Sequence, residues 1–193
     1  MQQVAVKVLA RDSFRTSEWE ILAALSRHRH PHILSTRACF LTSDTYDLVS
    51  ELILGSDLET FLLEVASDDY AQEFRFQASQ IVQAMEFLHD NMIGHFDLKG
   101  EILMDDRSRC LKMIDFDTAE VVNAPLTARK MTTAHYLAPE IMLTNRQVEA
   151  SQGYGLPADM WSFGVNLYYL WTHRVQGVKW SGLVPSVSWK YGR

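Results

Sequence analysis

The chain has 193 residues, of which 47% are hydrophobic, so it is long enough to form one or two compact units with a buried core. Its formal net charge of −6 argues against a nucleic-acid binder or a protein of anionic membrane surfaces. No apolar run has membrane-spanning length, and no basic-then-apolar signal segment opens the chain. Cys39 and Cys110 stand alone, which is typical of packing thiols. We therefore expect a soluble, cytoplasmic globular protein.

A short β-branched run lies near the start of the chain, at residues 4–9 (Val-Ala-Val-Lys-Val-Leu). Such a run predicts a buried strand. Lys7 is its one charged residue. A lysine in a strand most often turns to solvent at the edge of a sheet, and for Lys7 taken alone that interpretation is favoured.

Residues 14–27 have the periodicity of a helix. The residues that recur at the spacing of one helix face are Glu18, Ile21, Leu22 and Leu25. Glu20 points away from that face. A carboxylate on an apolar face needs a partner, because an unpaired buried charge is costly. We therefore predict that Glu18 comes within ion-pairing distance of Lys7.

Two further strands are predicted between Ile33 and Leu54, joined by a turn at residues 42–44 (Thr-Ser-Asp). Asp57 follows in the position of an N-cap for a helix that starts at Leu58.

Two long helices are predicted in the rest of the chain. The first spans residues 70–90, and its apolar stripe consists of Phe74, Ala78, Ile81, Val82, Met85 and Leu88. The second starts near Asp159 and continues to about Trp171. Residues 175–193 have no helical or alternating period, which predicts an irregular tail.

Two short apolar runs between these helices carry carboxylates at their edges. Asp97 and Lys99 lie in the first run, residues 94–104, and Asp115 lies in the second, residues 111–117. We expect the two runs to form a pair of short strands with connecting turns. An acid that orients a hydroxyl, a cation near a transferred phosphate and a second acid that holds metal would together suit phosphoryl transfer.

The order and flanking sequence of these motifs resemble those of eukaryotic protein kinases. Residues 95–99 (His-Phe-Asp-Leu-Lys) resemble the catalytic-loop His-Arg-Asp-Leu-Lys, and residues 115–117 (Asp-Phe-Asp) resemble Asp-Phe-Gly. Residues 138–140 (Ala-Pro-Glu) match the end of the activation segment. Residues 4–7 (Val-Ala-Val-Lys) match the strand that carries the ATP-contacting lysine.

The resemblance covers about residues 3–173 and implies the two-lobe, α+β kinase fold. A partial small, β-rich lobe would occupy residues 1–54, and a partial large, helical lobe residues 55–173. Residues 174–193 would form the irregular tail. Asp159 would hold the backbone of the catalytic loop from the start of its helix.

The resemblance also implies catalytic roles. Asp97 would orient the substrate hydroxyl, Lys99 would neutralise the γ-phosphate, and Thr133 would bridge to both. Asp115 would bind magnesium (Mg2+). Leu98 with Lys99, together with the threonines before residues 138–140, indicates the serine/threonine type rather than the tyrosine type.

For the nucleotide, the resemblance implies that Lys7 reaches the α- and β-phosphates of ATP and pairs with Glu18. The other residues that it places around the adenine and ribose are Ser50, Glu51, Leu52, Asp57 and Leu103. Ser50 would limit the back of the pocket, and Glu51 and Leu52 would offer backbone groups to the base. For Asp57 a ribose contact and a helix N-cap are equally open and compatible.

The chain also departs from the kinase pattern. Ile102 directly follows Glu101, so the asparagine with which the family holds a second metal ion is missing by substitution or by deletion, and deletion preserves the apolar strand pattern better; Asp117 replaces a glycine. Phe96 replaces the arginine that grips an activation-segment phosphate, as also occurs in titin-type kinases; this and other short matches suggest the titin and obscurin group. Only three residues precede Val4, so we expect the glycine-rich loop to be missing, and because the kinase pattern stops after about Trp171 we expect the last large-lobe helices to be missing too.

Two functions remain open at this point. The first is a serine/threonine protein kinase domain that acts on a protein substrate, as an incomplete or degenerate copy with slow or undetectable turnover. The second is a pseudokinase, an inactive module that binds a scaffold partner. We also expect uncovered apolar surface on the sheet and on the helix from Asp159, and hence a marginally stable chain.

Overall fold

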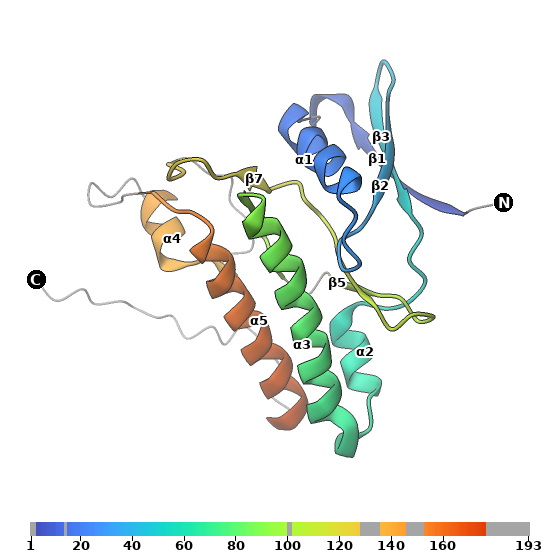
Figure 1. The fold of residues 1–193 in the computed structure, drawn as a ribbon, viewed down its shortest axis with the longest axis vertical. Helices are drawn as coiled ribbons and strands as arrows, with labels where there is room; N and C mark the ends of the chain where they lie inside the picture. Colours follow the sequence, from blue (N-terminus) through green and yellow to red (C-terminus); the bar gives the residue numbers. More distant parts are fainter. Residues whose placement is uncertain (1–2, 14, 100–101, 128–135, 146–152, 177–193) are drawn as a thin grey trace, which may run out of the picture.

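The computed structural model describes residues 3–13, 15–99, 102–127, 136–145 and 153–176. A strand-rich part with one helix lies beside a part built from longer helices, and short hairpins lie between them (Figure 1). The strand-rich part comprises β1 (Val4–Ala10), the 3-10 turn η1 (Arg11–Ser13), α1 (Thr16–Arg27), β2 (Thr36–Leu41) and β3 (Thr45–Glu51). This arrangement agrees with the predicted α+β fold.

The helical part follows β3 in the chain. Its helices are α2 (Leu58–Glu64), α3 (Ser67–Asp90), α4 (Pro139–Asn145) and α5 (Pro157–Gln176). Its short strands form two antiparallel pairs, β4 (Ile93–Gly94) with β7 (Glu120–Val121), and β5 (Ile102–Met104) with β6 (Leu111–Met113). The predicted pair of short strands around Asp97 and Asp115 is thus confirmed as β5 and β6. Helix α5 continues to Gln176, beyond its predicted end.

The three-stranded sheet has the antiparallel order β1-β3-β2. Its inner face carries Tyr46 and Leu48, which are buried beside α1. Its outer face carries Val4, Val6 and Val8, which are 41%, 51% and 60% exposed. The prediction of a fully buried strand is therefore wrong for β1. An antiparallel strand can have one face on the core and the other in solvent.

Helix α1 has the predicted register. The four residues assigned to its inward face are all buried: Glu18, Ile21, Leu22 and Leu25. Glu20 is exposed. Rotation of the helix by one residue position would expose its apolar residues to solvent. The hydrophobic spacing alone therefore determines which face of α1 is buried.

The predicted stripe of α3 is only partly correct. Val82 is 47% exposed, whereas Gln77 and Gln80 are buried at 1% and 3%. The Gln80 carboxamide explains the exchange: its oxygen accepts a hydrogen bond from the Leu111 N–H (2.9 Å) and its nitrogen donates to Gln77 Oε1 (3.0 Å). A buried amide with partners on both sides is tolerated, and it joins α3 to β6.

Three polar residues on one face of α5 hold the loops that surround the candidate site. Asp159 is fully buried; its carboxylate accepts from the backbone N–H groups of His95 (2.8 Å) and Phe96 (2.7 Å). Asn166 Nδ2 donates to the Leu98 carbonyl (2.8 Å), and Ser162 Oγ donates to the Tyr136 carbonyl (2.8 Å). The predicted structural role of Asp159 is thus confirmed.

Exposed apolar side chains lie where the sequence predicted them. On the sheet they include the β1 valines and Phe40 (59% exposed), and on α5 they include Tyr168 (64%) and Met160 (52%). Scattered exposed apolar residues are ordinary, but several on one sheet face, here around Asp47 of β3, form a surface that another molecule or segment can cover. Within the described residues, no helix is both long and apolar enough to cross a membrane.

We predict that Asp159→Ala lowers the free energy of unfolding by about 3 kcal/mol, because it leaves buried N–H donors without an acceptor. Urea unfolding measures the loss. Met160→Ala, an exposed change on the same helix, is the control and should cost less than about 0.5 kcal/mol. A loss for Asp159→Ala no larger than that of the control would contradict this account.

Candidate active site

His95 joins the two loops that carry Asp97 and Asp115. Its Nε2 lies 3.0 Å from the Ile114 carbonyl oxygen, and its own carbonyl accepts from Thr118 Oγ1 (2.8 Å). The imidazole also packs on the ring of Phe116, with centroids 5.0 Å apart. Because these contacts come from both sides of the histidine, the loop after β4 and the loop after β6 are held together.

Phe96, which stands where the kinase motif described above has arginine, fills an apolar space. Its ring is 2% exposed and meets Tyr154 edge-on at 5.2 Å. It packs into a second core cluster whose other buried members are Val122, Leu137, Ala138, Ile141, Tyr154 and Ala158. The backbone of Phe96 is left-handed (φ 61°), and Gly94 is required beside it because an added Cβ would overlap the phenyl ring. An apolar ring cannot pair with a phosphate group as an arginine would.

Asp97, Lys99 and Asp115 line one narrow cavity together with Ile102 and Met113. Lys99 Nζ lies 3.0 Å from Asp97 Oδ2, so the lysine partly neutralises that carboxylate. The structure therefore brings these three predicted residues together, although they come from different loops.

Lys7 connects the sheet to this cavity. Its Nζ lies 2.9 Å from Asp115 Oδ1, an ion pair between β1 and the loop after β6. Burial by itself would lower the pKa of Lys7, but the hydrogen bond to Asp115 and the charges of Asp115 and Glu18 outweigh burial and raise it. Lys7 thus turns toward the site, although its side chain is still 48% exposed in an edge strand.

Glu18 is buried near Lys7, but the predicted ion pair between them is wrong. The carboxylate of Glu18 accepts a hydrogen bond from the Tyr46 hydroxyl (3.3 Å), and the ammonium group of Lys7 pairs with Asp115 instead. Tyr46 supplies the partner that a buried acid needs, so Lys7 can reach the other carboxylate. Burial raises the pKa of Glu18, and the charge of Lys7 opposes that shift.

Asp117 adds a further carboxylate at the same site. Its pKa is raised, chiefly by burial and then by the negative charge of Asp115. The left-handed residue of this turn is Asp115 (φ 63°), and Asp117 has no positive φ. The aspartate therefore replaces the family's glycine without backbone strain in this conformation.

Of the residues predicted around the adenine, Ser50 and Glu51 end β3 and Leu52 follows it. The Glu51 N–H donates to the Ser35 carbonyl (3.0 Å), so this donor is already used, and the Glu51 carbonyl accepts from Ser50 Oγ (3.3 Å). Leu52 is 37% exposed. Carbonyl groups retain a second lone pair for a ligand, so the contact of Glu51 and Leu52 backbone groups with the base stays a prediction.

Asp57 caps helix α2, accepting hydrogen bonds from Thr60 N (2.9 Å) and Thr60 Oγ1 (2.8 Å). The N-cap interpretation is thus confirmed, and both oxygens of the carboxylate are engaged. Asp57 also forms a β-bridge with Leu103, which lies in β5. Thr133 lies outside the described residues.

Sequence reasoning missed the ion pair between Lys112 and Glu51. Lys112 Nζ lies 2.9 Å from Glu51 Oε1, which also accepts from the Ser35 N–H (2.9 Å). The pair joins β6 to the end of β3. Alternation in β6, which buries Leu111 and Met113, could have indicated that Lys112 points to the opposite side.

Comparison with known proteins agrees with this geometry. The family model of the protein kinase domain matches residues 1–177. The chain belongs to the protein kinase family. Relatives include a protein kinase C of Drosophila melanogaster, 32% identical over 85% of this chain, and a calcium/calmodulin-dependent protein kinase of Emericella nidulans, 31% identical over 87% of it. Assignment to the titin and obscurin group stays a prediction.

The kinase chain spans only part of these relatives, 22% of the Drosophila protein and 41% of the Emericella protein. Among solved structures, a chain in the crystal structure of the yeast RNA polymerase II CTD kinase CTDK-1 complex is similar with a TM-score of 0.67 and 28% identity. That match covers 86% of this chain and 54% of the other. It confirms the kinase fold.

The residues of this kinase fit a magnesium–nucleotide complex in part. Asp115 offers a carboxylate, the kind of oxygen ligand that magnesium prefers. No group of three His, Cys, Asp or Glu side chains suited to a metal occurs among the described residues. Magnesium in such sites takes one or two carboxylates and completes its shell with phosphate and water, so a dedicated protein cage is not required.

Glu18→Gln should change how stability depends on pH. The folded chain raises the pKa of Glu18 above its ordinary 4.5, so the wild type should lose stability as the pH rises above that value. Glutamine does not titrate, and the variant should lose less over the same interval. Urea unfolding of both proteins near pH 4.5 and near neutral pH makes the comparison. A wild type that gains stability relative to the variant as pH rises would contradict the burial of Glu18.

Proposed function

We propose that this chain is the catalytic part of a serine/threonine protein kinase that transfers the γ-phosphoryl group of ATP to a protein hydroxyl, with slow turnover. The observation that carries the proposal is the 2.9 Å pair of Lys7 and Asp115 beside the 3.0 Å pair of Asp97 and Lys99. Lys7 and Asp115 thus provide a cation for phosphate and a carboxylate for metal. Asp97 and Lys99, next to them, provide a carboxylate and a cation for the reacting hydroxyl. The cytoplasm, where ATP is available, is the proposed location.

Each residue has a proposed part in this reaction. Asp97 orients the incoming hydroxyl and accepts its proton, and Lys99 offsets the charge that develops next to it. Lys7 contacts the α- and β-phosphates, and Asp115 holds the metal ion. Bound magnesium would supply charge neutralisation between the phosphates. Glu18 stays near Lys7 and helps to keep the ammonium charge in place.

The slow turnover follows from Ile102. This residue is buried in β5 and pairs with Met113, at the point where the family has the asparagine that binds the second metal ion. Loss of one such ligand would cost about a hundredfold in rate, or about 3 kcal/mol in the barrier. Asp117 is a carboxylate that can offset part of this loss.

A pseudokinase is the second candidate. The same isoleucine favours it, because an apolar residue in a strand cannot take the place of a metal ligand. In this function the fold would present a surface to a protein partner, and Lys7 and Asp115 would stabilise each other across the two parts of the chain.

Phosphoryl transfer from radiolabelled ATP to a generic basic protein substrate separates the two functions. We predict slow incorporation into serine and threonine that falls by about a hundredfold or more in Asp97→Ala. Insertion of one asparagine between Glu101 and Ile102 should raise the wild-type rate, and the same insertion in Asp97→Ala is the matched control. Incorporation that is undetectable with and without the insertion would refute the kinase proposal and leave the pseudokinase.

A further inference from the structure

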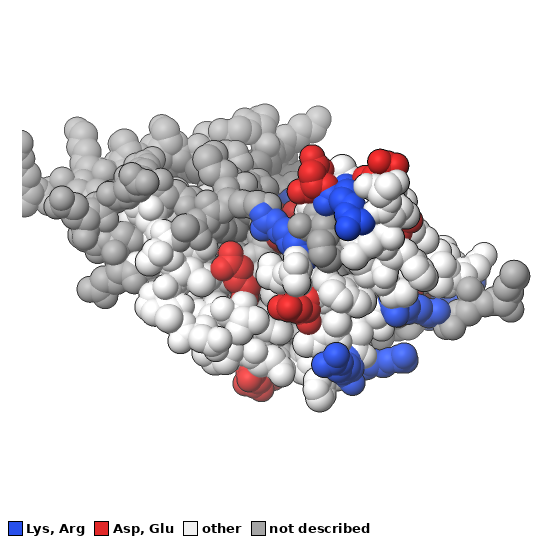
Figure 2. Space-filling view, turned by 90° about the horizontal axis from the view of Figure 1, so that it is seen from above, with Lys and Arg blue, Asp and Glu red and all other residues white. Residues whose placement is uncertain are grey.

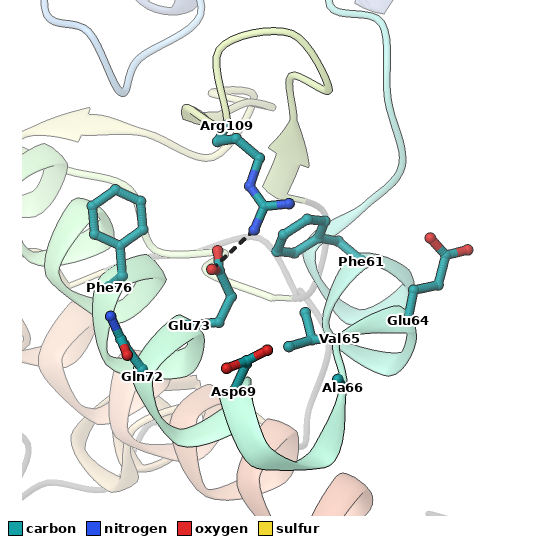
Figure 3. Close-up of a pocket in the computed structure, with 9 residues that line it drawn as sticks. All are labelled: Phe61, Glu64, Val65, Ala66, Asp69, Gln72, Glu73, Phe76 and Arg109. Carbon is teal, nitrogen blue, oxygen red and sulfur yellow. Dashed lines mark ion pairs between the residues drawn. The ribbon is translucent and has the colours of Figure 1, made fainter.

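A groove of about 640 Å³ lies between α2, the first turns of α3 and the turn that joins β5 to β6 (Figure 3). Neither the Lys7–Asp115 pair nor the Asp97–Lys99 pair contributes to its walls. It has the volume of a ligand site and is a separate feature of the fold.

The walls of this groove are partly apolar. Phe61 and Val65 line it from α2 and the residue after it, and Phe76 lines it from α3 (Figure 3). Phe76 is 52% exposed. An apolar side chain that packed on this ring would remove its surface from water. Such burial is favourable by about 25 cal/mol per Å² of apolar area.

The groove is also acidic. Glu64, Asp69 and Glu73 line it, against the single cation Arg109. Arg109 Nη2 already pairs with Glu73 Oε2 at 2.9 Å, and its guanidinium lies 4.7 Å above the Phe61 ring. Arg109 is thus committed to Glu73 and the aromatic wall. Glu64 and Asp69 have no ion pair among the described residues, although Asp69 lies in the first turn of α3, whose N-terminus partly offsets its charge.

Across another face of the molecule, by contrast, Lys and Arg are interspersed with Asp and Glu (Figure 2). The groove therefore combines a net negative charge with exposed aromatic surface in one concave site. Anionic ligands such as nucleic acid, acidic lipids or acidic peptides would be repelled by Glu64 and Asp69. Complementary charge and shape favour a cationic ligand with an apolar side chain.

We propose that this groove docks a short basic segment of a partner protein. Lysine or arginine side chains of that segment pair with Glu64 and Asp69, and an apolar side chain packs on the exposed ring of Phe76. The inference depends on the groove and not on phosphoryl transfer. If the partner is also a substrate, docking would raise its effective concentration at the site that contains Asp97.

Fluorescence anisotropy of the full chain tests the proposal with a labelled peptide that carries two arginines and two leucines. We expect saturable binding that weakens as salt is added. Glu64→Lys with Asp69→Lys should weaken binding by about tenfold or more. Phe76→Ser should weaken it by a similar factor. The control is Glu86→Lys with Asp90→Lys, the same change of charge at exposed positions of α3 outside the groove, and it should change the affinity less than about twofold.

Circular dichroism shows which variants fold. If the variant with Glu64→Lys and Asp69→Lys does not fold, Glu64→Gln with Asp69→Asn is used in its place. Equal weakening by the control pair would overturn the proposal, because it would show a general charge effect. Equal binding of a peptide with glutamates for the arginines, or no effect of the groove substitutions, would do the same. Binding that persists in Asp97→Ala supports docking even where phosphotransfer fails.

Discussion

Solvent does not reach the carboxylate of Asp159, which accepts hydrogen bonds from the backbone of His95 and Phe96 and lies 3.0 Å from His89 Nε2. A buried carboxylate is costly unless such donors surround it. The donors belong to a segment in which Phe96 has a left-handed backbone, a conformation that costs of order 1 kcal/mol or more. The hydrogen bonds to Asp159 offset that cost and thereby fix the position of the backbone that leads into Asp97. Asn166 and Ser162 extend the same support along α5.

The second constraint is electrostatic and joins the two parts of the chain. Lys7 comes from the sheet and Asp115 from the loop after β6, and their ion pair lies where several acids gather. Glu18 and Asp117 both have raised pKa values, chiefly because they are buried, and each also feels the charge of Asp115. Lys7 and Lys99 both lie among these carboxylates, and their positive charges reduce the mutual repulsion of the acids.

Local patterns in the sequence predicted much of this arrangement. The spacing of Glu18 with the leucines fixed the buried face of α1, and the motifs around Asp97 and Asp115 indicated both the family and the short hairpin. These features depend on neighbours in the chain, which periodicity and motif spacing can report. The family resemblance also placed Asp159 correctly, although its partners are distant in sequence.

The errors have a common physical origin, since each involves a choice between partners brought together only by folding. Whether Lys7 pairs with Glu18 or Asp115 depends on the Tyr46 hydroxyl, which satisfies Glu18 from another strand. Gln80 is buried because the Leu111 N–H needs an acceptor. The Val8 side of β1 is exposed because α1 packs only against the other face. No periodicity in a single segment encodes such competition.

The most direct test of the account is whether Lys7 and Asp115 form the phosphate and metal end of a nucleotide site. Calorimetric titration should compare magnesium–ATP with adenosine for the wild type, Lys7→Met and Asp115→Asn. The account predicts that each substitution weakens magnesium–ATP by about tenfold or more and leaves adenosine almost unchanged. Wild-type affinity of both variants for magnesium–ATP would contradict it.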